Sequence, residues 1–355
     1  MRKTRKAAAI LTAAAMAAAS AMPVMADEIK DLYDYELQSR EIETWNVLYS
    51  QLATDLQVLT NLYDGLLESD EYGKLAPAVA ESWETEDNGI TWTFHLRQGV
   101  KWVDQNGNEK GEVTAQDFLT GLEWVLNFHK NDATNTAMPM EMIEGAEDYY
   151  NMTSELDADA GLALTAESPE FADTVGIKAI DDYTLQYTCV SEKPYFDTVA
   201  TYNCLYPISQ AMIDEIGIDG FKAATPENIW YNGAYTCTEY IQQNTKTLTK
   251  NPLYWDTDAK LFDSVTVKMV ESVDTAYQLY TTGELDYENG RIQAGWRYDS
   301  KCCQEAVAKE VKKLESPKLS DTINYDYIKD KMDTMLDDFM DKVTEGIVGN
   351  DKEGK

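Results

Sequence analysis

The sequence predicts an α/β fold, because short strand-like segments alternate with helical segments along most of its 355 residues. In residues 91–96, Trp92, Phe94 and Leu96 alternate with polar residues, which is the period of a strand with one buried face. In residues 115–126, apolar residues recur every three to four positions, which is the period of a helix. The chain is also long enough for two lobes that each have a core.

The first 26 residues have the features of a secretory signal peptide. A basic start from Arg2 to Lys6 precedes an Ala-rich apolar stretch, and Val24 and Ala26 occupy the −3 and −1 positions of a cleavage site. We therefore expect export to the periplasmic or cell-surface side of a bacterial membrane, with cleavage after Ala26. A retained membrane anchor is the alternative, but the stretch is only weakly apolar and charged residues follow it at once.

The chain is strongly acidic, with 63 Asp and Glu against 30 Lys and Arg and a formal net charge of −33. Such a chain repels nucleic acid and anionic lipid, so neither is an expected partner. The charge favours solubility outside the cell. The 22 Tyr and 8 Trp exceed what solubility requires, and we interpret them as aromatic surface for binding.

Two helices and the strand at residues 91–96 are expected in the first half of the chain. The first helix covers residues 46–67. A polar loop at residues 104–112 leads to the second helix, where Thr114 is placed as the N-cap and Asp117 faces the free amide groups of the first turn.

Strand character returns after an acidic middle segment. Residues 131–172 have weak periodicity, and we expect one short helix at residues 141–150 with loop elsewhere. Asp181 and Asp182 then form a turn signal between two strand-like runs.

The remaining segments continue the alternation of helices and strands. Residues 232–255 form a hairpin whose two strand-like runs flank a polar turn. The other expected elements are a helix near 209–216, a strand within 262–272, a helix over 274–287 closed by Gly283, and an amphipathic helix over 328–343 in the tail.

Five cysteines are present, which is an odd number without the spacing of a disulfide framework: Cys189, Cys204, Cys237, Cys302 and Cys303. Cys189 and Cys237 fall in strand-like runs and could be neighbours. The alternative is that they are small, buried apolar residues.

No catalytic or cofactor motif is found. The chain contains no G-x-x-x-x-G-K-[ST], no G-x-S-x-G and no H-E-x-x-H, and it has only two histidines. We expect no enzyme activity, no cofactor and no metal site. An exported carboxylate-dependent glycan hydrolase stays open as an alternative, although with 63 acidic residues any acid pair found by eye is close to chance.

Several motifs occur in an order that resembles a known family. These are "NLYDGLLESDEYGKLAPAVAESWETEDNGITWTFHLRQGVKWVD", "VTAQDF", "VGIKAIDDYTLQYTC", "PYFDTV", "NGAYTCTEYIQQNTKTLTKNPLYWD" and "TAYQLYTTGELD". Together they resemble the peptide-binding proteins of ABC importers, which are extracellular solute-binding proteins of family 5. The likeness runs from Glu41 to Asn289. It implies a periplasmic-binding-protein-like (type II) bilobal fold with mixed sheets, incomplete in this chain.

The resemblance also implies a division into domains. Lobe I would comprise residues 27–60 and 175–285, around the two ends of the chain, and an inserted α/β subdomain would comprise 61–174. Residues 286–355 would be a remnant of the far lobe, or an atypical helical tail, because no counterpart of that long lobe follows. A truncated remnant that binds no ligand is therefore a further alternative.

In that family, the Asn-Gly-Ala-Tyr and Asn-Pro-Leu-Tyr-Trp segments are structural signatures of lobe I. The resemblance implies that Gly233 permits a close backbone approach. It also implies that Pro252, Tyr254 and Trp255 hold the exit of the hairpin. The hairpin is therefore expected to be scaffold and not a binding site.

The family's ligand lies extended between the lobes, and its main chain pairs with protein main chain. The segment "WNVLYSQLATDLQVLTNLYDGLL" aligns without gaps with the family's first cleft loop, which places Gln51, Leu52 and Ala53 against the ligand. Asn46 and Val47 stand where the family usually has Asp-Pro.

A second ligand-binding segment is implied by "GELDYENG", where Tyr287, Glu288 and Asn289 would line the cleft. The function implied is capture of oligopeptides by a monomer, which delivers them to the permease subunits of an ABC transporter without any chemistry.

Overall fold

The computed structural model describes residues 32–34, 40–69, 73–131, 135–259, 261–288 and 291–292. The expected signal peptide and tail helix lie outside these residues, as do Asn289, Cys302 and Cys303. All of the described residues belong to one compact unit. Among them, no helix is both long enough and apolar enough to cross a membrane.

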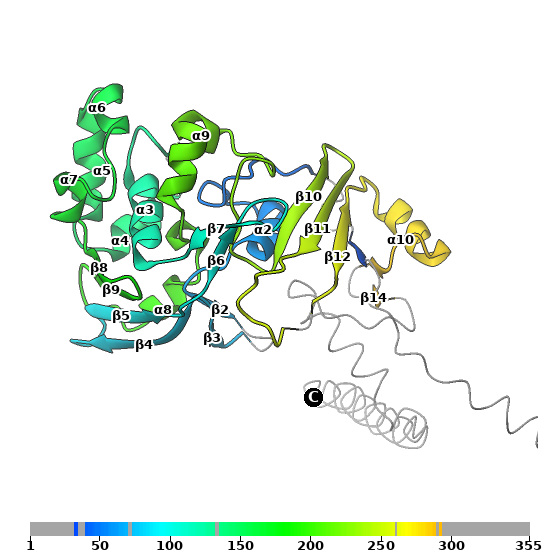
Figure 1. Cartoon of the computed structure of the whole chain (residues 1–355), viewed down its shortest axis with the longest axis horizontal. Coiled ribbons are helices and arrows are strands. Elements are labelled where there is room, and N and C mark those ends of the chain that lie inside the picture. Colours follow the sequence, from blue (N-terminus) through cyan, green and yellow to red (C-terminus); the bar gives the residue numbers. More distant parts are fainter. Residues whose placement is uncertain are drawn as a thin grey trace, which may run out of the picture. The chain divides into compact units, whose positions relative to one another are not determined.

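The first four-stranded sheet joins the two ends of the described chain (Figure 1). Its strand order is β1-β12-β11-β10, where β1 is parallel to β12 and the other pairs are antiparallel. The strands are β1 (Leu32–Asp34), β10 (Tyr235–Ile241), β11 (Thr245–Lys250) and β12 (Ser264–Lys268). The hairpin expected at residues 232–255 and the strand expected within 262–272 are therefore confirmed.

The second four-stranded sheet is antiparallel throughout, in the order β4-β5-β9-β8. Its strands are β4 (Ala80–Glu86), β5 (Thr91–Leu96), β8 (Ile177–Asp181) and β9 (Thr184–Thr188). Trp92, Phe94 and Leu96 are buried on one face of β5, as the alternation predicts. This sheet draws strands from both 61–174 and 175–285, and the division into lobes stays a prediction.

Three two-stranded hairpins complete the strands: β2 (Leu67–Ser69) with β3 (Leu75–Pro77), β6 (Lys101–Val103) with β7 (Glu109–Glu112), and β13 (Tyr287–Glu288) with β14 (Arg291–Ile292). The loop expected over residues 104–112 is wrong at its end, where β7 forms. Asp104 is the physical reason, because its Oδ1 accepts hydrogen bonds from the amides of Asn106 and Asn108, each at 2.9 Å. This closes a turn that sends the chain back along β6.

The longer helices are α2 (Ala53–Leu62), α3 (Ala115–Leu126), α5 (Ala146–Glu155), α9 (Gln210–Lys222) and α10 (Val273–Thr282). Helix α3 begins with the expected capping box of Thr114 and Asp117 and packs on β8 (Figure 1). Helix α10 ends at Gly283, whose φ of 81° is left-handed, as expected. The helix expected over residues 46–67 is wrong at both ends: a turn at 46–49 precedes α2, and α2 ends at Leu62 because the chain is extended at Tyr63.

The segment 131–172 is more helical than expected. Besides α5 it forms the short helices α4 (Ala137–Met142), α6 (Ala158–Leu162) and α7 (Pro169–Ala172), and later in the chain α8 (Phe196–Val199) and the 3-10 turn η1 (Asn203–Leu205) follow. The single helix expected at 141–150 is split by Gly145, which has a φ of 68°. Helix α9 extends beyond the expected Ile216, with a kink at Gly217.

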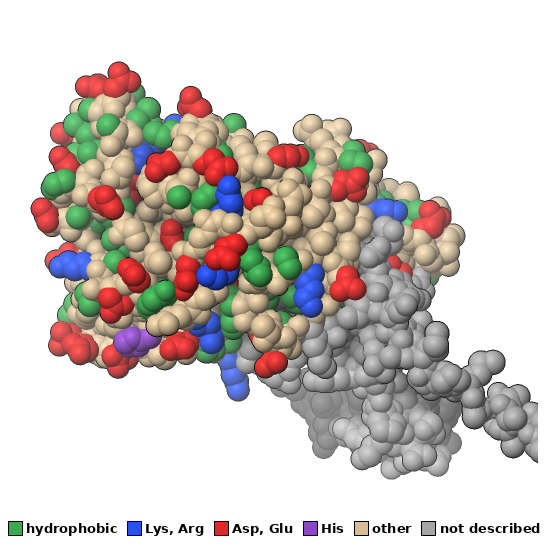
Figure 2. Space-filling view, in the orientation of Figure 1, with side chains coloured by type: hydrophobic (Ala, Val, Ile, Leu, Met, Phe, Trp, Pro, Cys, Tyr) green, Lys and Arg blue, Asp and Glu red, His purple; other side chains and the backbone are tan. Residues whose placement is uncertain are grey.

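Much of the aromatic content lies in the core, not on a binding surface. The largest fully buried side chains include Trp102, Trp124, Tyr63, Tyr187 and Tyr231. Phe94 packs edge-on against Tyr187 with ring centroids 6.0 Å apart. The interpretation of abundant Tyr and Trp as binding surface is therefore wrong for these residues. The face in Figure 2 instead carries many scattered acidic groups among fewer basic ones.

The described cysteines do not form a disulfide. Cys189, Cys204 and Cys237 are each free and buried, so the possible Cys189–Cys237 pair is not formed and the apolar alternative is correct. Burial raises the pKa of the Cys189 thiol to about 11. It raises the pKa values of the Cys204 and Cys237 thiols to about 12.

The hairpin of β10 and β11 packs against the end of α2. Gly233 lies against the α2 backbone, where a Cβ would be only 2.6 Å from the Tyr63 nitrogen. The Asp64 carboxylate accepts hydrogen bonds from Tyr254 Oη at 2.9 Å and from Trp255 Nε1 at 2.7 Å. The close approach expected at Gly233 and the anchoring role expected of Tyr254 and Trp255 are confirmed.

The buried carboxyl group of Asp117 is expected to make the free energy of unfolding depend on pH, and the variant Asp117→Asn tests this dependence. Burial raises its carboxyl pKa to about 6 from an ordinary 3.8, although Thr114 and Trp102 donate hydrogen bonds to it. The native state therefore holds this proton over a pH range in which the unfolded chain has lost it. Its contribution to stability is complete below about pH 4 and is lost as the pH rises through 6.

We expect the unfolding free energy of Asp117→Asn to rise relative to that of the parent chain by up to ~3 kcal/mol between pH 4 and pH 7. Urea titrations of both proteins across this range measure the difference. A difference that stays flat with pH would contradict the raised pKa.

Candidate ligand-binding site

Residues 46–53, called here the 46–53 loop, connect the start of the described chain to α2. Asn46 is fully buried, its Oδ1 accepts the Leu48 amide at 3.0 Å, and its Nδ2 donates to the Phe221 carbonyl at 3.0 Å. The Tyr49 amide then closes a turn on the Asn46 carbonyl at 3.1 Å. Asn46 thus supplies both an acceptor and a donor, and an aspartate at this position would lack the donor.

Two side chains from distant parts of the chain bind the carbonyls of this loop. Asn135 Nδ2 donates to the Leu48 carbonyl at 2.8 Å and to the Ser50 carbonyl at 3.1 Å. Asn203 Nδ2 donates to the Val47 carbonyl and, at 2.9 Å, to the Ser50 carbonyl. The Ser50 carbonyl therefore accepts two hydrogen bonds.

Asp55 holds the junction between the loop and α2. Its Oδ2 accepts from Ser50 Oγ at 2.9 Å, and Ser50 Oγ in turn accepts from the Leu52 amide at 3.2 Å. Burial raises the pKa of the Asp55 carboxyl, and the Ser50 hydrogen bond opposes this shift. The chain at Leu52 is extended, with φ −95° and ψ 129°, before the helix begins at Ala53.

The three residues of the 46–53 loop that were predicted to bind the ligand are at least partly exposed to solvent. Gln51 and Ala53 are exposed and Leu52 is half-buried. The carbonyls of residues 46, 47, 48, 50 and 52 each accept a hydrogen bond within the protein. Among the described residues, neither the amide nor the carbonyl of Gln51 has such a partner. Gln51 therefore presents a peptide donor and a peptide acceptor that have no partner among the described residues.

The second predicted segment is a separate strand. Tyr287 and Glu288 form β13, which pairs with β14 and contacts α10 and β1. Asn289 lies outside the described residues. No hydrogen bond among the described residues joins this strand to Gln51, Leu52 or Ala53.

Two pockets lie away from both predicted segments. One, of about 270 Å³, is lined by Thr60, Asn61, Tyr63, Asp64, Gly65, Leu67, Glu68, Ser69, Ala78, Thr201 and Tyr206. The other, of about 420 Å³, is lined by Glu81, Leu96, Arg97, Gln98 and Trp255. In the second, the Arg97 guanidinium stacks 4.4 Å from the Trp255 ring, and its Nε donates to the Ala78 carbonyl at 2.8 Å. Arg97 therefore contacts both Trp255, after the β10–β11 hairpin, and Ala78, between β3 and β4.

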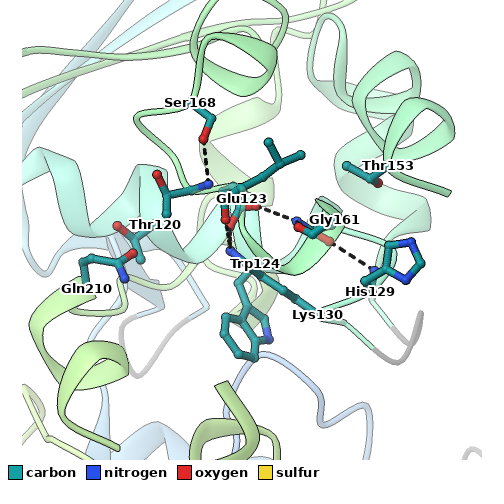
Figure 3. A network of polar contacts seen from close by, with 12 residues as sticks. Thr120, Glu123, Trp124, His129, Lys130, Thr153, Gly161, Ser168 and Gln210 are labelled. Atoms are coloured by element: carbon teal, nitrogen blue, oxygen red, sulfur yellow. Dashed lines mark hydrogen bonds and ion pairs between the residues drawn. The ribbon is translucent and has the colours of Figure 1, made fainter. Parts of the chain in front are cut away.

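A buried polar cluster lies at the C-terminal end of α3 (Figure 3). Lys130 Nζ is 2.7 Å from Glu123 Oε2, with side chains only 6% and 2% exposed, and it also donates to the Leu164 carbonyl. Glu123 Oε1 accepts from Asn127 Nδ2 and from Tyr149 Oη, each at 2.8 Å. Burial and the neighbouring Glu123 raise the Tyr149 pKa well above its ordinary value.

This cluster also supports the 46–53 loop. Tyr49 Oη donates to the Lys130 carbonyl at 2.6 Å and accepts from Trp124 Nε1 at 3.3 Å. The Trp124 ring packs edge-on against Phe221, whose carbonyl binds Asn46. The end of α3 therefore fixes the turn of the loop.

The buried acids described above have structural partners, which does not favour the hydrolase alternative. Glu123 is paired with Lys130, and Asp64 accepts from Tyr254 and Trp255. Asp117 caps α3 and Asp55 accepts from Ser50. A glycosidase needs two carboxyl groups facing a substrate across a cleft.

Sequence reasoning missed Asn135 and Asn203. Both stand in segments interpreted as loop or left without a role, and their partners lie 85 and 153 residues away at Ser50. The one signal near this loop in the sequence was the presence of Asn46-Val47 where the family usually has Asp-Pro, and it pointed to neither residue.

Comparisons with known proteins agree with this architecture. The model of bacterial extracellular solute-binding proteins, family 5 (middle), matches residues 74–331. The chain is 32% identical to the oligopeptide-binding protein AmiA of Streptococcus pneumoniae over 282 residues, which cover 78% of this chain and 40% of AmiA. It is 34% identical over 232 residues to the periplasmic oligopeptide-binding protein OppA of Escherichia coli, covering 65% and 38%.

Solved structures give the same result. An oligopeptide ABC transporter substrate-binding domain from Bacillus anthracis matches with a TM-score of 0.61 at 27% identity, covering 74% of this chain and 45% of that one. A Haemophilus influenzae OppA complex with RPPGFSPFR matches with a TM-score of 0.62 at 26% identity, covering 81% and 49%. The expected fold is confirmed for the part covered, and the chain spans about 40% of the length of its curated relatives.

Members of this family are non-catalytic binding proteins located outside the cytoplasm. The family expected from the ordered motifs is confirmed. With residues 74–331 matched by the family model, the chain belongs to the bacterial extracellular solute-binding proteins of family 5.

Proposed function

We propose that this chain captures oligopeptides outside the cytoplasmic membrane and delivers them to the permease subunits of an ABC importer, without chemistry. The proposal rests on the main chain of Gln51, whose amide N–H and carbonyl both lack a partner among the described residues. The carbonyls of residues 46, 47, 48, 50 and 52 accept hydrogen bonds within the protein, whereas these two groups of Gln51 have no such partner among the described residues. A peptide main chain supplies the complementary acceptor and donor. The curated relatives AmiA and OppA are named as oligopeptide-binding proteins.

The proposal assigns ligand contacts to two segments. Gln51, Leu52 and Ala53 bind one edge of the extended peptide through their main chain. Tyr287, Glu288 and Asn289 line the other side, beyond α10.

The proposed protein is an exported monomer, and its signal peptide is removed after Ala26. Lobe I then comprises residues 27–60 and 175–285, with the α/β subdomain of 61–174 inserted in it. An exported form whose N-terminal sequence begins elsewhere than Asp27 would refute the cleavage site.

If the ligand is bound through the main chain, two substitutions at Gln51 should affect the peptide affinity differently. Gln51→Pro removes the amide donor, whereas Gln51→Ala removes only the side chain. We expect Gln51→Ala to leave the peptide Kd within about twofold and Gln51→Pro to raise it about tenfold, the size of one lost hydrogen bond.

Isothermal titration with a mixture of short peptides measures these affinities. Sugars and Ni²⁺ serve as competing ligand classes. No heat from peptides with the parent chain would refute peptide capture, and equal affinity of both variants would refute recognition through the Gln51 amide.

A further inference from the structure

The Ser50 carbonyl accepts hydrogen bonds from two side chains, whereas the Val47 and Leu48 carbonyls each accept from one. It accepts from Asn203 at 2.9 Å and from Asn135 at 3.1 Å. Asn203 is 8% exposed and Asn135 is half-buried. Two side chains from different parts of the chain thus converge on one oxygen.

Because the peptide bond is planar, the hydrogen bonds to the Ser50 carbonyl also fix the direction of the Gln51 N–H. The Ser50 carbonyl and the Gln51 N–H belong to the same peptide group, and in a trans peptide they point in opposite directions. Fixing the carbonyl toward the two amide side chains therefore directs the N–H away from them. This is the N–H that has no partner among the described residues.

We infer that Asn135 and Asn203 are positioning residues for the ligand, because they aim the Gln51 N–H by holding the other end of its peptide group. The inference rests on the proposed function for the identity of the ligand, an extended peptide main chain. The orientation of the peptide group itself does not depend on that function.

The residue type fits this role. Each Nδ2 carries two hydrogens, and each Asn donates to two loop carbonyls: Asn135 to Leu48 and Ser50, and Asn203 to Val47 and Ser50. An ionised Asp of the same shape has no hydrogen to donate and would repel the carbonyls. Asn-to-Asp exchange therefore removes the donors with almost no change in volume.

The test compares Asn135→Asp, Asn135→Gln and Asn203→Ala with a matched control. Asn228→Asp removes an equivalent hydrogen bond, from Asn228 Nδ2 to the Gly220 carbonyl at 3.2 Å, outside the loop. The full chain is titrated with the short-peptide mixture. In parallel, hydrogen exchange is followed without peptide in fragments that cover residues 50–56, where the Leu52, Asp55 and Leu56 amides are hydrogen-bonded.

We expect Asn135→Asp and Asn203→Ala to raise the peptide Kd about tenfold and to speed exchange in residues 50–56, with exchange in α3 unchanged. Asn135→Gln keeps the donor and recovers part of the affinity, and Asn228→Asp leaves both measurements unchanged. Because Asn135 is half-buried, its variants test the inference even if Asn203→Ala does not fold.

Unchanged Kd and unchanged exchange in Asn135→Asp would overturn the inference. If the parent chain binds no peptide, the proposed function fails, and the exchange measurement alone decides whether the two Asn side chains hold the loop.

Discussion

Replacing Lys130 with Met is expected to lower the free energy of unfolding by about 3–5 kcal/mol, the cost of leaving a buried charge without its partner. Glu123 is only 2% exposed and lies 2.7 Å from Lys130 Nζ. Asn127 and Tyr149 still donate to Glu123 in the variant, but neither brings a positive charge. Urea unfolding of the full chain, followed by Trp fluorescence, measures the change.

Two controls separate the charge from the loss of a long side chain. Glu123→Gln combined with Lys130→Met removes both charges and keeps an acceptor for Tyr149, so it should recover more than half of the lost stability. Lys101→Met is the same exchange at an ion pair with Glu109 on the surface, and its effect should be far smaller. Equal losses in Lys130→Met and Lys101→Met would contradict the special cost of the buried pair.

Replacing Asp64 with Leu is expected to lower the free energy of unfolding by about 2–4 kcal/mol, because the buried Tyr254 and the half-buried Trp255 both lose their acceptor. Tyr254 Oη and Trp255 Nε1 both donate to Asp64 Oδ2, across separations of 190 and 191 residues. Tyr254 is 8% exposed, so water cannot readily replace the carboxylate there. Urea unfolding again gives the loss.

A double-mutant cycle assigns this loss to the contact. Tyr254→Phe removes one donor and not the acceptor, so it should cost less than Asp64→Leu. The combination of both should cost less than the sum, with a coupling free energy of about 1 kcal/mol or more. Strict additivity would show that Asp64 stabilises the chain independently of Tyr254.

These two predictions concern the contacts that hold the scaffold around the 46–53 loop. The Lys130 carbonyl binds Tyr49 of the loop, and Asp64 lies two residues after the end of α2, the helix that follows the loop. A large loss of stability at either place is therefore expected to disturb ligand capture as well. The ligand experiments above therefore use Gln51 and Asn135, which are exposed or half-buried, in addition to the buried Asn203.

Family membership was predictable from the sequence, because it rests on the order and spacing of motifs along the chain. The alignment of the first cleft loop placed Gln51, Leu52 and Ala53 against a ligand, which stays a prediction; in the structure Gln51 and Ala53 are exposed and Leu52 is half-buried at the start of α2. The start of the helix was missed, because Asn46 binds both the Leu48 amide and the distant Phe221 carbonyl. Helical periodicity contains no sign of the second contact.

The positions of the aromatic residues could not be predicted from the amino-acid composition either. Composition counts Tyr and Trp without regard to position, and it favoured a binding surface. Trp102, Trp124 and Tyr63 are instead packed in the interior, where their large apolar area stabilises the fold.

The sequence by itself determined the features whose partners lie within a few residues: the buried face of β5, the capping box of Thr114 and Asp117, and the left-handed Gly283 that ends α10. Local backbone geometry brings such residues together whatever the rest of the chain does. Only the tertiary structure decided that Asn135 and Asn203 meet at Ser50, and that Asp64 meets Tyr254. These contacts join residues 85 to 190 positions apart, and no spacing pattern encodes them, because they exist only after the separate elements have packed.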